Sequence, residues 1–346
     1  MTASSKWAPV APKSSEKPQA RWHHTATAVD RKIVVFGGFQ DNTKRFNDVW
    51  VFDTHTLKWS QPIKLRSESE ISGGGGGGGK RAPTPQPRGE HAACQMNGSV
   101  YIFGGYGGPD WSRRDFNDLY ALDTMSWGWK VVNPGNQLFG AAKQVVEENS
   151  DSEEEEPEIF PEPRASHTLS ALGTDKLVLF GGWNSKEQFS DVWIFSLETS
   201  RWSELEIAEP LSEPRWSHGA IVAESIPHDQ LYVFGGSSGE ITKKNVAGRY
   251  SQDLWMLDLI DGRWTKVKCK NPPKARSDSE LAYSESSRNL YVFGGWSNKW
   301  YKDMWSNDCG PYVGELNFFL FSSPPPLPFP PSPHFIRPLL VEKEEQ

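Results

Sequence analysis

Four histidines stand at the same place in a repeated pattern, and they are the first residues whose type and spacing suggest chemistry. Each follows an arginine by three residues, and a fifth arginine has a serine there instead. The pairs are Arg21 and His24, Arg88 and His91, Arg164 and His167, Arg215 and His218, and Arg276 and Ser279. Imidazole binds transition metals, so four equivalent imidazoles could surround one ion. Because each histidine keeps step with the repeat, a structural hydrogen bond within each unit is the simpler interpretation, and we expect no metal site.

Other groups that carry enzyme chemistry are scarce. The three cysteines, Cys94, Cys269 and Cys309, are too widely spaced for a disulfide framework or a metal-ligand pair, and they indicate free thiols in a reducing compartment. The sequence contains neither a phosphate-binding loop nor a nucleophile elbow. It therefore predicts a chain without a catalytic centre and without a cofactor.

A short apolar stretch that ends in two glycines occurs five times, first as residues 33–38. The glycine pairs are Gly37 and Gly38, Gly104 and Gly105, Gly181 and Gly182, Gly235 and Gly236, and Gly294 and Gly295. Each run of bulky residues before a pair predicts a strand buried on both faces, because a half-exposed strand alternates apolar with polar residues. The glycines allow positive φ and close approach of another backbone. One such strand cannot bury itself, so the five copies predict similar units that share a core.

Two more features follow each glycine pair. An Asp-apolar-aromatic triplet begins at Asp48, Asp118, Asp191, Asp253 and Asp303, and a tryptophan stands 11 residues after the first four, at Trp59, Trp129, Trp202 and Trp264. This constant spacing predicts a tight hairpin, whose register cannot slip without turning the packed face outward. The spacings on either side vary. We therefore expect units of four strands, a to d, with tight a–b and c–d turns and variable b–c and d–a loops.

Four-stranded units at a spacing of about 50 residues are typical of a β-propeller, and this pattern resembles the kelch-repeat family over about residues 6–306. The resemblance implies an all-β fold of blades around a central axis. It also implies that the glycines lie near strand ends and that each repeat tryptophan is wedged between neighbouring blades.

The chain ends predict how the ring closes. The fifth unit lacks the tryptophan after Asp303, whereas Lys6 to Val10, with Trp7, resembles an isolated d strand. We predict that this strand completes the last blade, and Pro9 suits its edge position. The expected blades are about 21–65, 88–132, 164–209, 215–270 and 276–308 plus 6–10; the five detectable units leave room for a sixth. Together they form a propeller over 6–308, after a disordered N-terminus at 1–5.

Two insertions and a tail interrupt the pattern. The insert at 66–87 is glycine-rich, and the insert at 133–162 is acidic. Both lack the apolar residues needed to order themselves. In the acidic insert, Ser150 and Ser152 are candidate phosphorylation sites, although a solvated spacer is the simpler interpretation. The tail at 309–346 is proline-rich and predicted to be disordered. It offers a candidate ligand for a proline-binding domain.

The variable loops indicate where a partner would bind. Because strand direction alternates, the b–c and d–a loops emerge on one face, and variable loops on a rigid repeat commonly carry recognition. Arginine and aromatic residues suit such a surface because they provide contact area and directional hydrogen bonds. The candidate contacts are Lys44, Arg45, Trp111, Arg113, Arg114, Trp183, Lys243, Lys244, Arg249, Trp296, Lys299 and Trp300. The alternative is that each is solvated or packs against its own blade.

Enzymes built on kelch-like propellers provide a test of the catalytic alternative. A copper oxidase of that kind needs a Cys–Tyr pair with further His and Tyr ligands, and no such grouping is evident. Iron-binding specifier proteins carry a Glu-x-x-x-Asp-x-x-x-His pattern; Glu147 and Asp151 have this spacing, but Glu155 occupies the third position. The alternative kept open is a metal or small-molecule site at the propeller mouth.

The fourth and fifth units carry a more specific resemblance. The segments 224–228, 275–279 and 293–300, with Gly310-Pro311-Tyr312, are similar to the N-terminal kelch domain of green-algal-type axonemal outer-arm dynein heavy chains. That resemblance implies a scaffold in a cilium whose partners are axonemal dynein components. The immunoglobulin-like domain expected after Tyr312 is replaced by the proline-rich tail, which puts the connection to a motor in doubt.

Composition and motifs together favour a protein-binding scaffold or adaptor in the cytoplasm, or in a ciliary axoneme if the dynein resemblance holds. The net charge is −7, but eight acidic residues lie in segment 147–158, so the remainder is close to neutral. Basic residues are not clustered, which argues against nucleic acid, and no apolar run is long enough to span a membrane. A third alternative is a substrate adaptor for a ubiquitin ligase recruited in trans.

Overall fold

The computed structural model describes residues 10–41, 44–63, 84–108, 113–137, 158–209, 211, 213–224, 228–239 and 249–308. The chain divides into two compact units, Met1–Gly310 and Pro311–Gln346, and all described residues belong to the first. The predicted strand at 6–10 therefore lies outside the described residues except for Val10, and so do the proline-rich tail, Ser150 and Ser152. No helix in the described part is long and apolar enough to cross a membrane.

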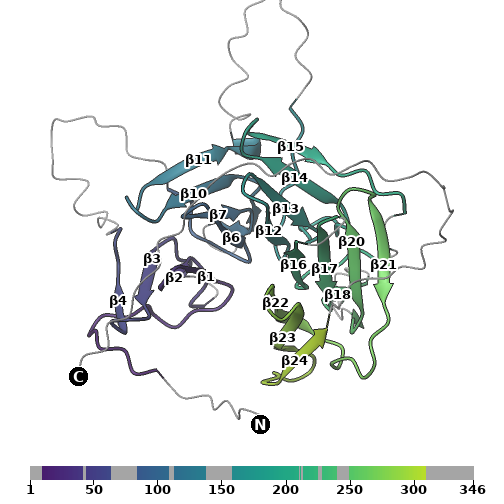
Figure 1. Ribbon diagram of the computed structural model, residues 1–346. Coiled ribbons are helices and arrows are strands. Elements are labelled where there is room, and N and C mark those ends of the chain that lie inside the picture. Colours follow the sequence, from purple (N-terminus) through teal and green to yellow (C-terminus); the bar gives the residue numbers. More distant parts are fainter. Residues whose placement is uncertain are drawn as a thin grey trace, which may run out of the picture. The chain divides into compact units, whose positions relative to one another are not determined.

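Five main antiparallel sheets make up the described part of this unit, which confirms the all-β kelch-type fold. Sheet 1 contains β1 (Thr25–Val29), β2 (Lys32–Phe36), β3 (Val49–Asp53) and β4 (Lys58–Ser60). Sheet 2 contains β6 (Ala92–Met96), β7 (Ser99–Phe103), β10 (Leu119–Asp123) and β11 (Trp129–Asn133). Sheet 3 contains β12 (Thr168–Leu172), β13 (Lys176–Phe180), β14 (Val192–Ser196) and β15 (Arg201–Glu204). Figure 1 shows the first strand of each sheet towards the centre and the last strand outside.

Sheet 4 contains β16 (Gly219–Ala223), β17 (Gln230–Phe234), β20 (Leu254–Asp258) and β21 (Arg263–Val267). Sheet 5 has three strands among the described residues, β22 (Ser277–Ser284), β23 (Asn289–Trp296) and β24 (Met304–Asp308). The short strands β5 (Arg88–Gly89), β8 (Tyr106–Gly107) and β9 (Arg114–Asp115) form a small ladder, and β18 (Ser237–Ser238) pairs with β19 (Arg249–Tyr250). One 3-10 turn, η1 (Gly135–Gln137), follows β11.

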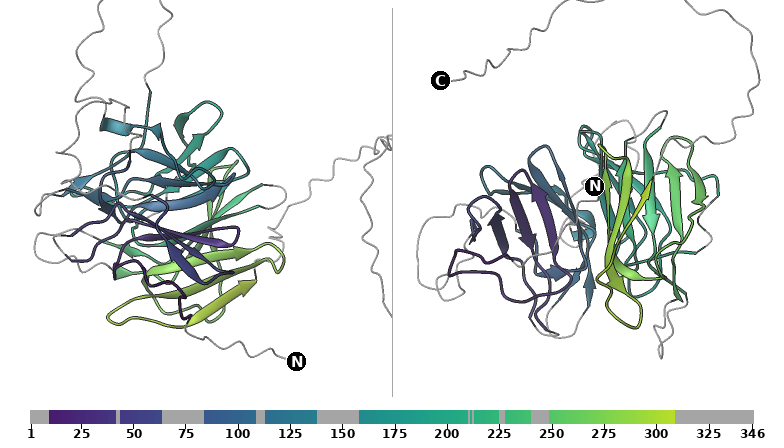
Figure 2. Two further views of the ribbon diagram at one scale, coloured as in Figure 1. Left: turned by 90° about the vertical axis from the view of Figure 1, so that its left-hand side faces the viewer. Right: turned by 60° about the horizontal axis from the view of Figure 1, so that its bottom comes forward.

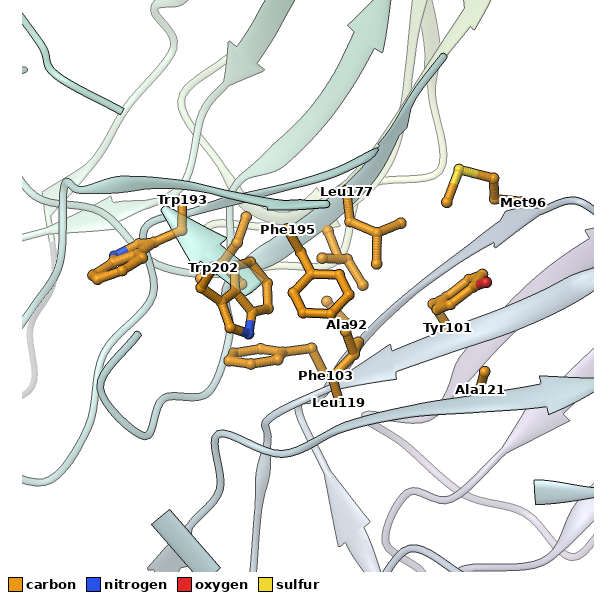
Figure 3. Packing of buried hydrophobic residues seen from close by; sticks show 12 residues of the cluster. Ala92, Met96, Tyr101, Phe103, Leu119, Ala121, Leu177, Trp193, Phe195 and Trp202 are labelled. Atoms are coloured by element: carbon orange, nitrogen blue, oxygen red, sulfur yellow. The ribbon is translucent and has the colours of Figure 1, made fainter. Parts of the chain in front are cut away.

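The core lies between successive sheets. Phe36 of sheet 1 packs edge-on against Trp129 of sheet 2, with ring centroids 5.1 Å apart, and the same arrangement joins Phe103 to Trp202. Figure 3 shows the second of these joints, where side chains of sheets 2 and 3 face one another around Trp202 and Phe195. Burial in these joints explains why the second strand of each unit is apolar on both faces.

The glycine pair allows one sheet to approach the next. The N–H of Gly38 donates at 2.8 Å to the carbonyl of Arg88, in the segment that leads into sheet 2, and Gly105 donates at 2.8 Å to Arg164, in the segment that leads into sheet 3. A Cβ on Gly37 would come within 2.7 Å of the same Arg88 carbonyl, and Gly37 has a φ of 65°. Glycine is needed here for both backbone conformation and space.

The same bond continues around the repeat until it reaches sheet 5. Gly182 donates to the carbonyl of Arg215 and Gly236 to that of Arg276, each at 2.9 Å. Gly295 of sheet 5 instead lies inside β23, where a Cβ would come within 2.7 Å of the Ser277 carbonyl of the neighbouring strand. The position near a strand end, implied by the family resemblance, is found in all five sheets. In sheets 1 to 4 the second strand ends just before the pair, whereas pairing with the longer β22 carries β23 through Gly294 and Gly295 to its end at Trp296.

The repeat arginine and aspartate form an ion pair inside each of four units. Arg88 donates to both carboxylate oxygens of Asp118, at 2.5 and 2.9 Å, and to the carbonyl of Gly104 at 2.9 Å. The equivalent pairs are Arg21–Asp48, Arg164–Asp191 and Arg276–Asp303. In units 1, 3 and 5 the aspartate also accepts the indole N–H of the tryptophan two residues later. The Asp-apolar-aromatic triplet therefore joins an ion-paired aspartate to the first residues of a strand.

Three of the four repeat histidines hydrogen-bond between sheets, which corrects the expectation of a bond within each unit. Nε2 of His91 lies 2.9 Å from Oγ1 of Thr25 in the preceding sheet, and Nε2 of His167 lies 3.2 Å from the Phe103 carbonyl. His218 reaches Thr168 in the same way, at 3.1 Å. The hydrogen bond joins two sheets because the d–a loop places each of these histidines beside the innermost strand of its own sheet, next to the preceding sheet.

The joint between sheets 5 and 1 differs from the others. The innermost strands of successive sheets pack together from β1 to β22, whereas β22 and β1 do not make the same close contact, and the ribbons stand apart there (Figures 1 and 2). Phe293 is 40% exposed, while its equivalents Phe36, Phe103 and Phe180 are at most 1% exposed. Met304 of β24 is 54% exposed. Sheet 5 therefore presents to solvent a face that the other four sheets bury.

Candidate partner-binding face

The d–a and b–c loops meet on one face, which we call the loop face. In sheet 1, bridges join Trp22 of the d–a loop to Phe39, which follows the glycine pair, and Phe39 to Arg45 of the b–c loop. In sheet 2 the same three segments form β5, β8 and β9. Equivalent bridges are Ala165–Trp183–Gln188, Trp216–Ser237 and Trp296–Trp300. The two classes of variable loop are thus held together by backbone hydrogen bonds.

A ring of five residues surrounds the centre of the loop face, one from each sheet. These inner-ring residues are His23, Glu90, Ser166, Ser217 and Asp278, and each has a φ between 51° and 54°. The N–H of each residue after His23 donates to the carbonyl of the previous one, at 3.0, 2.9, 2.9 and 2.8 Å in chain order. Residues other than glycine rarely hold positive φ, so this conformation must be maintained by the surrounding packing.

The inner ring carries a polar network. Nδ1 of His23 lies 2.8 Å from Glu90, whose other oxygen accepts the hydroxyl of Ser166 at 2.5 Å. Burial lowers the pKa of His23, but its hydrogen bond to Glu90 and the charges of Glu90 and Asp278 together raise that pKa above its usual value. Burial raises the pKa of Glu90, while the hydrogen bond and charge of His23, with Ser166 and Arg113, leave it lowered overall. The network therefore favours an ionised carboxylate beside a protonated imidazole.

Aromatic side chains gather around this ring. The guanidinium of Arg113 lies 4.1 Å from the ring centroids of both Tyr106 and Trp183, and it also ion-pairs with Asp115 at 2.8 Å. The rings of Trp183 and Trp216 lie with their centroids 6.3 Å apart. On sheet 5, the ring centroids of Trp296 and Trp300 are 4.9 Å apart, and Trp300 is 72% exposed. Such amphipathic groups provide rigid contact area at little cost in conformational entropy.

The structure describes nine of the twelve candidate contacts. These nine are Lys44, Arg45, Arg113, Arg114, Trp183, Arg249, Trp296, Lys299 and Trp300; Trp111, Lys243 and Lys244 lie outside the described residues. All nine belong to the loop-face segments just described. Several also have contacts within the chain: Lys44 bonds Gln19 at 2.7 Å, Arg45 bonds the Gly108 carbonyl, and Arg249 pairs with Glu213. Arg114, Lys299 and Trp300 are exposed to solvent on this face.

Sequence reasoning missed the inner ring. Its members are the third residue of each Arg-x-x-His segment, a position occupied by His, Glu, Ser, Ser and Asp. Polar character at that position is the one signal that could have identified them. Positive φ and axial position follow from contacts between sheets, so neither was visible in the spacing.

Of the four repeat histidines, His91, His167 and His218 are buried and His24 is exposed, and among the described residues they do not come together as a group of possible metal ligands. Burial, with the charge of the neighbouring arginine, lowers the pKa of His167 and of His218 to about 3, so both are neutral. Their Nε2 atoms are engaged as described above. Among the described residues, one group of possible ligands comes together, namely His228, Asp258 and Asp261, with ligand atoms within 4.8 Å of one another. It lies at the a–b and c–d turns of sheet 4, on the face opposite the loop face.

The chain matches the family model of the "KLHDC2/KLHL20/DRC7 Kelch-repeats domain" at residues 1–77, 78–226 and 144–311. It is 25% identical over 312 residues to the dynein alpha chain of the flagellar outer arm of Chlamydomonas reinhardtii, covering 89% of this chain and 6% of that protein. It is 26% identical over 320 residues to an F-box/kelch-repeat protein of Arabidopsis thaliana, covering 84% and 57%. It is 33% identical over 196 residues to Kelch domain-containing protein 1 of Mus musculus, covering 56% and 37%. The chain thus spans less than two thirds of each of these relatives.

Proposed function

The chain belongs to the kelch-repeat family, and from this premise we propose that it is a non-catalytic scaffold or adaptor that binds other proteins through its loop face. The observation that carries the proposal is the recurrent ladder that joins the d–a and b–c loops. It holds loops of unequal length on one face of a rigid repeat, around a centre lined by aromatic rings and a polar network. Rigid scaffolds with variable loops are suited to recognising a protein surface.

The chemistry at the centre of the loop face supports binding rather than catalysis. Its carboxylate, Glu90, is already engaged by His23 and Ser166, and the guanidinium of Arg113 lies against two aromatic rings. A general base or nucleophile needs an atom directed at substrate, and these groups are directed at one another. The alternative enzyme with a metal at the propeller mouth predicts a stoichiometric transition metal in purified protein, which elemental analysis would detect.

Charge reversal on the loop face tests the proposal. The double variant Arg114→Glu with Lys299→Glu and the single variant Trp300→Ala change exposed side chains of this face. The matched control, Lys58→Glu with Arg263→Glu, reverses two exposed charges at the start of the outermost strands, beside the opposite turns. Each bait is exposed to an extract of cells that express the chain, and captured proteins are then purified and titrated.

We expect wild type and the control to capture the same partners, and the loop-face variants to bind at least tenfold more weakly. Equal affinity for all baits would show that recognition lies elsewhere. Circular dichroism of each variant confirms that the sheets are retained.

A finer proposal is that the scaffold works in an axonemal dynein-type assembly, with outer-arm components as partners. The similarity to the outer-arm dynein alpha chain along 89% of this chain supports it, together with the marks in units 4 and 5. A tagged chain should then appear in isolated axonemes and leave them with the outer arms in high salt. Retention in the cell body would reject the axonemal assignment and leave the scaffold proposal standing.

The ubiquitin-ligase adaptor is a second candidate, favoured by the similarity to an F-box/kelch-repeat protein. Here the loop face would hold a substrate and a ligase subunit would be recruited in trans. This alternative predicts that wild-type baits recover ligase subunits and that their recovery survives the loop-face variants, because a second surface would make that contact.

A further inference from the structure

The residue after each glycine pair belongs to the loop face, and it is aromatic in four of the five sheets. These residues are Phe39, Tyr106, Trp183 and Trp296, and sheet 4 has Ser237. In sheets 1 to 3 an arginine of the chain lies over the ring. The guanidinium of Arg45 is 5.7 Å from the ring centroid of Phe39, and that of Arg113 is 4.1 Å from those of Tyr106 and Trp183. Among the described residues, no lysine or arginine lies over Trp296 in this way.

Sheet 2 shows how such a ring binds a cation. Tyr106 is the cross-strand partner of Gly89, which precedes Glu90, and of Asp115. Arg113 lies over Tyr106 and pairs with Asp115 at 2.8 Å. It is also close enough to Glu90 for its charge to act on that carboxylate. The guanidinium is thus held by an aromatic face and by carboxylates, both of which attract a cation.

Sheet 5 has the equivalent framework without the arginine. Trp296 is the cross-strand partner of Ser277, which precedes Asp278, and it is bridged to Trp300. Asn298 stands two residues before Trp300, at the position that the arginine has in sheet 2. The side chain of Asn298 is exposed and neutral. Sheet 5 therefore keeps the ring and the inner-ring carboxylate, and replaces the cation by an amide.

Trp300 supplies a second ring to this framework. Its ring centroid lies 4.9 Å from that of Trp296, with the two planes inclined by 57°. Trp300 is exposed and Trp296 is half-buried, so both rings are accessible from solvent. In sheet 2 the second ring over the arginine, Trp183, comes from the next sheet. Its counterpart beside sheet 5 is Phe39, which is buried under Arg45, so here both rings come from one sheet.

The carboxylate beside these rings is fixed in place and lacks a basic partner. Asp278 is exposed, its backbone N–H donates to the carbonyl of Ser217 at 2.8 Å, and its Oδ2 accepts the hydroxyl of Ser277 at 2.6 Å. Within the described part of the chain, no lysine or arginine forms an ion pair with Asp278. The charge of Asp278 acts on His23, but Nδ1 of that histidine is bonded to Glu90.

The two basic residues beside this framework in the chain are directed elsewhere. Arg276 lies over the ring of Tyr301 and pairs with Asp303 at 2.6 Å. The Nζ of Lys299 lies 5.6 Å from the centroid of the same tyrosine ring. The framework of sheet 5 therefore carries a negative charge and two aromatic faces, which are complementary to a cation from outside the chain.

We propose that Trp296, Trp300 and Asp278 form a binding site for an arginine side chain of a protein partner. The partner supplies the guanidinium that sheets 1 to 3 take from the chain itself. A guanidinium stacks on an aromatic face and donates paired hydrogen bonds to a carboxylate, so it suits this set better than a compact ammonium group does. The inference rests on the proposed function and names one group that the loop face recognises.

Titration of the full chain with a short peptide tests the site. The probe is a capped glycine–arginine–glycine peptide, and the control peptide has citrulline, which keeps the shape of the arginine side chain and lacks its charge. NMR at constant ionic strength follows the indole N–H signals of Trp296 and Trp300, assigned from the Trp296→Phe and Trp300→Phe variants. We expect saturable shifts with the arginine peptide in the millimolar range, and binding of the citrulline peptide at least about tenfold weaker.

Three variants locate the bound guanidinium. Asp278→Asn removes the carboxylate at constant size and should weaken binding of the arginine peptide by about tenfold. Asn298→Arg gives sheet 5 its own arginine, which should occupy the site and weaken the peptide by a similar factor. Glu187→Gln is the matched control, because it removes one exposed carboxylate from the b–c loop of sheet 3 on the same face, and it should leave binding unchanged.

Arginine-selective shifts that are lost in Asp278→Asn and in Asn298→Arg, and retained in Glu187→Gln, support the proposal. The absence of shifts up to about 50 mM peptide would overturn it, since that concentration exceeds the expected dissociation constant. Equal binding of the two peptides would do the same, as would unchanged binding in Asp278→Asn or Asn298→Arg.

Partner capture separates this inference from the proposed function. If Arg114→Glu with Lys299→Glu loses the partners while Asp278→Asn retains them, the loop face binds proteins and the arginine site is not what they use, which overturns the inference alone. If the arginine peptide binds as expected but every loop-face variant retains its partners, the site stands and the proposed function fails.

Discussion

The joint between sheets 2 and 3 and the exposed side of sheet 5 are built from the same repeat pattern, but differ in what covers them. Phe103 and Phe293 precede equivalent glycine pairs, yet their exposures are 0% and 40%. Asp118 and Asp303 pair with equivalent arginines, and their side chains are 1% and 38% exposed. A repeat therefore determines which strand forms, while the neighbouring sheet determines how much that strand contributes to stability.

Truncating the two phenylalanines should give the largest difference. Phe103→Ala removes a ring packed between His167 and Trp202, and should lower the free energy of unfolding by about 4 kcal/mol. Phe293→Ala removes a partly exposed ring and should cost about 1 kcal/mol. Urea unfolding followed by tryptophan fluorescence measures both. Equal losses would mean that the exposed side of sheet 5 is covered in solution.

Neutralising the repeat aspartates should give the next largest difference. Asp118→Asn leaves the fully buried Arg88 guanidinium without its counter-charge and should cost about 3 kcal/mol. Asp303→Asn should cost less, about 1 to 2 kcal/mol, because solvent reaches the Asp303 carboxylate although Arg276 is as buried as Arg88. Arg276, through its hydrogen bond and charge, holds the pKa of Asp303 at about 2, so the contrast should persist in denaturation series from pH 5 to 8. A larger loss for Asp303→Asn than for Asp118→Asn would reverse the comparison.

Acid should destabilise the closed joints selectively. The pKa of His167 is about 3 in the folded chain and about 6.5 when unfolded, so below pH 6.5 the unfolded state binds a proton that the folded state does not. The free energy of unfolding therefore decreases as the pH is lowered, by about 2 kcal/mol between pH 6.5 and 5 for this histidine. In His167→Gln this part of the pH dependence should disappear. Sheet 5 has Ser279 at the equivalent position, so Ser279→Ala should leave the pH dependence unchanged.

The strands were the most predictable part of the fold. The apolar run before each glycine pair and the fixed distance from Asp to Trp are local patterns, and they correspond to β2 and to the β3–β4 register in which Phe52 pairs with Trp59. Local patterns succeed here because each hairpin determines its own register. The direction of the histidine bonds was not predictable, since Thr25 and His91 are 66 residues apart and meet only when two sheets pack.

The candidate site was predictable in position more than in detail. Alternating strand direction predicted a face that collects the b–c and d–a loops. It did not predict that Arg113 is stacked between Tyr106 and Trp183, because each ring comes from a different sheet. The inner ring was missed for the same reason.

By itself, the sequence determined the repeating unit: where each strand begins, where glycine is required, and which loops vary in length. These are properties of short segments, and short-range sterics and periodicity are sufficient to encode them. The tertiary structure alone decided which repeat positions are buried, how the five inner-ring residues meet at the centre, and that one side of sheet 5 is exposed. Those outcomes depend on contacts between distant segments, which exist only once one sheet has packed against the next.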